Sequence, residues 1–120
     1  MQRKEINTDF YELQRRIAVY EDEAAYKELF FRLYTSLKKF ATGFLRSVET
    51  AEEIVSDVFM EIWRRRNALM EIDDLRVYMY ICVRNAALRK LQQSRKDATV
   101  SLDDFAYEFT SSYINRRMLF

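Results

Sequence analysis

The sequence predicts an all-α fold, a compact bundle of about four helices followed by a C-terminal tether. The 120 residues include one Gly and no Pro, although tight hairpin turns and strand boundaries depend on these residues for positive or fixed φ. Hydrophobic residues make up 49% of the chain, enough for one core, and they recur at the three- and four-residue steps of a helix face. A chain of this length is expected to form one domain.

The first half of the chain contains two periodic segments. Residues 10–20 predict a first helix, with capping candidates at residues 7–9. After the acidic turn at residues 21–23, apolar positions from 26 to 45 keep helical spacing and predict a long core helix. Gly43 inside it costs about 1 kcal/mol relative to Ala. We therefore expect a closely crossing neighbour at Gly43, with fraying of the helix as the alternative.

The third helix has the clearest predicted start. Thr50 and Glu53 have the spacing of a capping box, in which the hydroxyl accepts from an N–H of the first turn and the Glu reaches back. The apolar side of this helix comprises Ile54, Val55, Val58, Phe59, Ile62 and Trp63. Because it continues that side, we expect Trp63 to be structural and to rest against Phe40 or Phe44 of the long helix.

Residues 67–74 interrupt the periodicity and predict a loop, in which Asp73 or Asp74 caps a fourth helix that runs to about residue 92. The apolar side of the fourth helix comprises Leu75, Tyr78, Met79, Cys82, Val83, Ala86 and Leu91. We expect the single cysteine to be a small buried hydrophobe. Residues 97–120 predict a tether, with one short helix from 101 to 109 as an alternative.

Acidic residues dominate the third helix, because residues 48–63 include five acids and no base. Steps of three and four residues bring one set of side chains onto a single stripe opposite the apolar side. The stripe comprises Glu53, Ser56, Asp57, Met60, Glu61 and Arg64. This pattern predicts a docking surface for a basic partner, and a merely solvated face is the alternative.

Basic residues dominate the fourth helix in the same way. Residues 76–96 include no acid and six bases, which are Arg76, Arg84, Arg89, Lys90, Arg95 and Lys96. Arg76, Tyr80 and Arg84 lie four residues apart on one face, and a ring between cations suits unstacked bases and phosphates. Ordinary packing of the Tyr80 ring is the alternative.

Catalysis has little support in the sequence. The chain has no His, the usual neutral-pH base and the commonest metal ligand. Glu49, Glu53, Asp57 and Glu61 lie four apart and could present oxygens to Mg²⁺, but such a site needs carboxylates from a second helix. We therefore expect no enzyme activity, no metal and no cofactor. Without a secretory signal or an apolar run near the ~20 residues of a membrane span, we expect a cytoplasmic protein that does not insert into membranes.

Three segments, in order and spacing, resemble region two of the bacterial extracytoplasmic-function sigma factors of the sigma-70 family. They are residues 26–34 (YKELFFRLY), 51–65 (AEEIVSDVFMEIWRR) and 76–85 (RVYMYICVRN). The resemblance extends over residues 20–96, and the middle segment is the most specific. It implies a helical transcription initiation domain that binds core RNA polymerase and promoter DNA.

The resemblance also implies partners for the two charged helices. The acidic helix would dock on the arginine-bearing coiled coil of the polymerase clamp, while the loop and the fourth helix would capture and melt the minus-ten element as single-stranded non-template DNA. Position by position, Glu53, Asp57 and Glu61 would face the clamp, with Ser56 and Met60 on the same stripe. Arg76, Tyr80, Arg84 and Asn85 would face DNA, together with Arg89 and Lys90 of the same basic run, and residues 67–74 would hold a flipped base.

The resemblance sets the expected domain organisation as well. Residues 1–96 would form the region-two domain, and residues 97–120 would be a linker or short helix toward a second, helix-turn-helix domain. Because the chain stops at Phe120, we expect either a fragment or a stand-alone domain. An anti-sigma factor is a further candidate partner. The alternative from another class is a helical protein-interaction adaptor that does not bind DNA.

Overall fold

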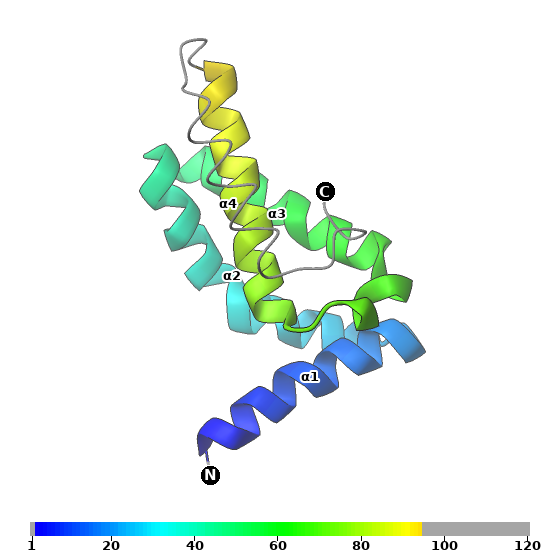
Figure 1. The fold of residues 1–120 in the computed structure, drawn as a ribbon. Helices are drawn as coiled ribbons and strands as arrows, with labels where there is room; N and C mark the ends of the chain where they lie inside the picture. Colours follow the sequence, from blue (N-terminus) through cyan, green and yellow to red (C-terminus); the bar gives the residue numbers. More distant parts are fainter. Residues whose placement is uncertain (1, 95–120) are drawn as a thin grey trace.

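The computed structural model describes residues 2–94, and for residues 2–9 it describes the backbone alone. This part of the chain is helical, without a strand, as predicted (Figure 1). Its elements are α1 (Gln2–Tyr20), α2 (Glu23–Leu45), α3 (Val48–Arg64), the 3₁₀ helix η1 (Arg66–Glu71) and α4 (Leu75–Ser94). The predicted tether at residues 97–120 lies outside the described residues.

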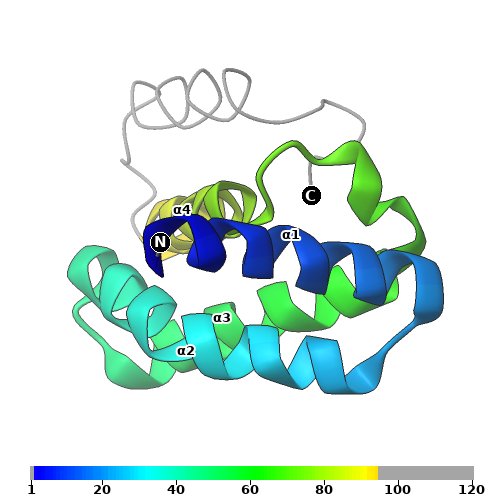
Figure 2. The same cartoon turned by 90° about the horizontal axis from the view of Figure 1, so that it is seen from below.

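Helices α2 and α3 are antiparallel neighbours, and α4 packs across both of them. Tyr26 near the start of α2 contacts Trp63 near the end of α3, whereas Lys38 near the end of α2 pairs with Glu52 near the start of α3. In Figures 1 and 2, α1 crosses the end of this bundle where α4 begins, and it lies beside η1. The result is one core shared by all the elements.

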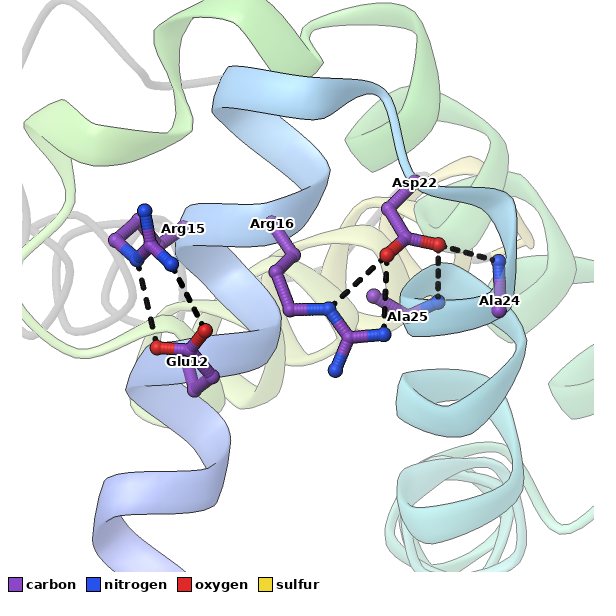
Figure 3. A network of polar contacts seen from close by, with 6 residues as sticks. All are labelled: Glu12, Arg15, Arg16, Asp22, Ala24 and Ala25. Carbon is purple, nitrogen blue, oxygen red and sulfur yellow. Dashed lines mark hydrogen bonds and ion pairs between the residues drawn. The ribbon is translucent and has the colours of Figure 1, made fainter.

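The turn between α1 and α2 is held by Asp22, the N-cap of α2. Its carboxylate accepts from the N–H groups of Ala24 (3.0 Å) and Ala25 (3.2 Å), and from Arg16 Nε of α1 (3.0 Å; Figure 3). Helix α1 begins at Gln2, well before the predicted capping residues at 7–9. The prediction of a short helix was wrong because Gln2, Arg3, Lys4 and Glu5 all favour helix and extend it toward the N-terminus.

The predicted cap of α3 was also wrong. Ser47 is the N-cap, and its hydroxyl oxygen accepts from the N–H of Thr50 at 3.3 Å, so Thr50 lies in the first turn. Arg46, just before it, adopts a left-handed conformation (φ 59°) and closes α2 by donating its N–H to the carbonyl of Thr42 at 2.8 Å. Because the chain turns out of α2 at Arg46, the next residue, Ser47, stands at the start of α3.

Two expectations about packing along α2 were wrong. A Cβ atom at Gly43 would meet nothing within 4 Å, so no helix crosses closely there, and the helix continues to Leu45 without fraying at this position. Trp63 does not rest against Phe40 or Phe44. The antiparallel arrangement carries it to the opposite end of α2, where its ring lies 4.9 Å from that of Tyr26.

The predicted loop contains a short 3₁₀ helix, η1, that buries Leu69 and Ile72. Asp74 then caps α4, accepting from the N–H of Val77 at 3.2 Å, which confirms one of the two predicted caps. Cys82 is buried, as expected, and burial raises the pKa of its thiol to about 12. Burial also raises the pKa of Tyr78 well above its usual value. Neither group is ionised at neutral pH.

Candidate functional site

The predicted acidic stripe is a continuous exposed surface along α3. Glu53, Ser56, Asp57 and Met60 are all exposed, and the thioether of Met60 retains 66% of its accessible surface. Among the described residues, no side chain pairs with Glu53 or Asp57. The middle of the stripe therefore carries two acids whose charges no neighbouring base neutralises.

Glu61 differs from the other acids of the stripe. Both of its carboxylate oxygens accept from Arg64 Nη2 at 2.7 Å, and Arg65 Nε lies 3.3 Å from one of them. The hydrogen bond from Arg64 lowers the pKa of Glu61 below its usual value. Because two arginines already neutralise it, Glu61 has less free charge to offer a partner than Asp57.

The predicted DNA-binding residues of α4 divide between different surfaces. Arg76 is exposed and lines a pocket of about 350 Å³ that α1 shares with the start of α4. Tyr80 is half-buried with its ring edge-on to Phe40 of α2 (5.1 Å), and the guanidinium of Arg84 lies over the ring of Phe44 (5.4 Å). The ring of Tyr80 therefore has a packing role whether or not it also contacts a base.

Arg89 and Asn85 do not lie on the same side of α4 as Arg76. Arg89 lines a groove of about 220 Å³ between α3 and α4, together with Asp57 and Glu61 of the acidic stripe. Asn85 is half-buried and follows Arg76 by nine residues, about two and a half helical turns, so it points to the opposite side. Lys90 is exposed near the end of α4. Arg76, Tyr80 and Arg84 follow one another at steps of four residues along α4, whereas Arg89 lies on the side that faces α3.

Gln14 of α1 is a residue that sequence reasoning missed. Its side chain is 2% exposed, and its amide nitrogen donates to the carbonyls of Leu69 (2.7 Å) and Ile72 (2.8 Å). The signal was present, because Gln14 shares the helical spacing of Phe10 and Ile17 and so lies on the face of α1 that meets the core. A polar residue on that face needs a buried partner.

A second missed feature is an apolar groove of about 560 Å³ where the start of α2 meets the end of α3. Its floor is the contact between Tyr26 and Trp63, and the Tyr26 hydroxyl donates to the carbonyl of Phe59 at 2.6 Å. Arg66 also lines the groove, with its guanidinium 4.5 Å from the centre of the Trp63 ring. Met60 lines both this groove and the acidic stripe, so the two surfaces are continuous.

The described residues contain no group of three or more His, Cys, Asp or Glu side chains placed to hold a metal ion. In the same part of the chain, every helix is too short or too polar to cross a membrane.

The sequence of the chain matches a family model. The model of sigma-70 region 2 matches residues 29–97, more than half of the chain, and so includes most of α2 and all of α3, η1 and α4. No curated protein and no solved structure matches the chain. Region 2 is a transcription factor domain rather than a catalytic family, and it acts in RNA polymerase binding and promoter recognition. The chain therefore belongs to the sigma-70 region 2 family, as a helical domain of a sigma factor in transcription initiation.

Proposed function

We propose that α3 binds the basic coiled coil of the polymerase clamp, while η1 and α4 hold the single-stranded non-template strand of the minus-ten element and keep it melted. The observation that carries this proposal is the exposure of Glu53 and Asp57, neither of which forms an ion pair among the described residues, on a helix that adjoins a helix rich in arginine. The acidic helix α3 would contact the basic clamp, and the basic helix α4 would contact DNA.

The clamp contact rests on electrostatic complementarity. Opposite charges steer two proteins together and fix their register more than they raise affinity. Glu53 and Asp57 would supply the charge, Ser56 a hydroxyl, and Met60 an exposed apolar side chain that can lose its water on binding. Glu61, which is neutralised within α3, would contribute less than Asp57.

The DNA contact rests on the group formed by Arg76, Tyr80 and Arg84. Cations on one side of α4 can neutralise successive phosphates, with a strong dependence on salt. An aromatic ring beside them can stack on a base once the base leaves the duplex. The segment 67–74 precedes α4 and exposes Asn67, Met70 and Asp73, which could contact a flipped base. Lys90 would then lie at the margin of this contact, and Asn85 and Arg89, on the other side of α4, would lie outside it.

These partners place the domain with the transcription machinery in the bacterial cytoplasm. A regulator that covered the acidic stripe would compete with the clamp for Asp57. An anti-sigma factor of this kind would need basic groups opposite Glu53 and Asp57.

The test of the clamp contact is a reversal of charge at Asp57. We expect Asp57→Arg to lose most of its capture of the polymerase clamp coiled coil in a pull-down, because it places like charges in contact. Glu28→Arg makes the same charge change on α2, where Glu28 faces α1 rather than the stripe, and it should bind as wild type does. Equal recovery of clamp by Asp57→Arg and wild type, both folded by circular dichroism, would remove the stripe from the interface.

A further inference from the structure

We propose that Gln14 is a positioning residue for DNA capture: from within the core, its amide holds the segment 67–74 in the shape that the melted strand contacts. This inference rests on the proposed function, since it assumes that the segment contacts DNA. It assigns a role in DNA binding to α1, a helix that the charge pattern does not connect with DNA.

The need for such a residue follows from the geometry of η1. The 3₁₀ helix ends in the core, where Leu69 and Ile72 are buried. The carbonyl of Leu69 accepts from the N–H of Ile72 at 3.0 Å, whereas the carbonyl of Ile72, just beyond the helix, needs a donor from elsewhere. A buried carbonyl left without a donor costs free energy comparable to a lost hydrogen bond.

Gln14 meets this need with a single group. Both of its amide hydrogens are used, because the nitrogen lies 2.7 Å from the Leu69 carbonyl and 2.8 Å from that of Ile72. The two carbonyls are three residues apart, so one amide fixes the distance between the last turn of η1 and the strand-like residue that follows it. An apolar side chain of the same size could fill the space without holding this geometry.

The same side chain connects the segment with α4. Gln14 lines the pocket that also contains Asp73, Asp74 and Arg76, and Asp74 caps α4. A shift of the backbone at Ile72 would therefore change the shape of the segment 67–74. It would also change the direction in which the side chain of Arg76 projects from α4. Because Gln14 is only 2% exposed, it acts through the backbone that it holds rather than by touching DNA.

The experiment compares two substitutions in the full 120-residue chain. Gln14→Met keeps the length and bulk of the side chain and removes both hydrogen bonds. Ile17→Val removes one methylene from the fully buried neighbour on the same helix and leaves the hydrogen bonds intact. For each variant we would measure affinity for a single-stranded minus-ten oligonucleotide, capture of the clamp coiled coil, and hydrogen exchange at the N–H of Ile72.

We expect Gln14→Met to bind the oligonucleotide about tenfold more weakly, the change that loss of one to two hydrogen bonds would produce. Exchange at Ile72 should accelerate, clamp capture should stay at the wild-type level, and Ile17→Val should match wild type in affinity for the oligonucleotide. If Gln14→Met fails to fold, Gln14→Asn replaces it, since the shorter amide cannot reach both carbonyls.

Oligonucleotide affinity in Gln14→Met equal to that of Ile17→Val would overturn the role of Gln14 while leaving the proposed function in place. A parallel loss of DNA and clamp binding would overturn it too, because it would show a general structural role. Absence of oligonucleotide binding by the wild-type chain would instead contradict the proposed function itself.

Discussion

At the scale of single residues, the one glycine of the chain lies three positions before Arg46, one of two described residues, with Glu21, whose positive φ suits glycine. Arg46 adopts φ 59° at the end of α2, a left-handed conformation that costs an L-residue about 1–2 kcal/mol. Gly43 lies within the helix without a positive φ and with open space where a Cβ would stand. Gly43 therefore lies where a helical backbone favours Ala, and Arg46 lies where a left-handed backbone favours Gly.

We expect Gly43→Ala to stabilise the domain by about 0.5–1 kcal/mol, the difference between Gly and Ala inside a helix. Arg46→Gly should relieve the left-handed strain and add a further gain of similar size. Urea unfolding measures both, and Lys39→Ala on the exposed side of α2 is the control, with a change within about 0.5 kcal/mol. Destabilisation by Gly43→Ala would show that a neighbour does approach this position.

Asp22 should make stability depend on pH. Hydrogen bonds from the N–H of Ala25 and from Arg16 lower the pKa of its carboxyl in the folded state. A lowered folded pKa means that the contribution is fully present above the ordinary Asp value of about 3.9 and is lost as the pH falls through the lower folded value.

We therefore expect the urea midpoint of wild type to fall on acidification from neutral pH, and that of Asp22→Asn to fall less. Asn also caps helices well, so the variant should lose little at neutral pH. The control is Asp73→Asn, an exposed acid that caps no described helix, which should keep the wild-type pH dependence. Parallel curves for wild type and Asp22→Asn would exclude this linkage.

The residue scale also shows what periodicity can and cannot predict. The burial of Ile54, Val58 and Ile62 follows from their spacing on one helix face, and the structure confirms it. The pairing of Glu61 with Arg64 and the bonds from Gln14 to η1 depend on rotamers and on tertiary contacts. Asp57 and Glu61 are both acids in the sequence. Because neighbouring arginines neutralise Glu61, it offers a partner less charge than Asp57 does.

At the scale of elements, the contact between α2 and α3 is a row of packed aromatic rings. Phe59 of α3 meets Phe30 at 4.9 Å and Tyr26 at 6.4 Å, both edge-on, and Trp63 continues the row. Edge-on aromatic pairs add about 0.5–1.5 kcal/mol beyond the burial of their surface. These ring contacts fix the position of α3, the helix that presents the acidic stripe, along α2.

We expect Trp63→Ala to destabilise the domain by about 2–3 kcal/mol, below the ~3–5 kcal/mol of a fully buried aromatic, because the ring is half-buried. Tyr26→Phe should cost about 1 kcal/mol through the lost hydrogen bond to Phe59. Val19→Ala, at a side chain of α1 that is 56% exposed, is the control and should stay within about 0.5 kcal/mol. If Trp63→Ala unfolds as wild type does, the ring belongs to an interface rather than to the core.

The four long helices and their order could be predicted from the sequence, whereas η1 and the starts of α1 and α3 could not. The helical spacing of hydrophobic residues persists over several turns in α2, α3 and α4, so the sequence predicts these helices. A helix end depends on one or two side chains, and both Ser47 and Thr50 are residues that can cap a helix. The left-handed turn at Arg46 decided between them, and the identity of that residue gives no sign of it.

At the scale of the whole molecule, a near-neutral chain separates its charges onto two adjoining helices. The net charge is only +1, yet α3 carries exposed acids and α4 exposed bases. The opposite signs of the two helices could be predicted from the linear sequence, and the resemblance to region two led to the partners proposed for them. The placement of Arg89 beside Asp57 could not be predicted, because it requires the packing of α3 against α4.

The proposed contact with single-stranded DNA lies on the side of α4 that carries Arg76, and the salt dependence of binding is its sharpest test. Fluorescence anisotropy would follow one promoter sequence as single strand and as duplex across a salt series, for wild type, Arg76→Ala and Arg89→Ala. The two variants remove the same charge from opposite sides of the same helix.

We expect tighter binding to the single strand, with a slope of about −0.7 for each phosphate neutralised. Arg76→Ala should lower both affinity and slope by about one phosphate contact, whereas Arg89→Ala should keep the wild-type slope. Equal affinity for duplex and single strand, with the same slope for Arg76→Ala and Arg89→Ala, would contradict the account and favour a protein-interaction adaptor that does not bind DNA.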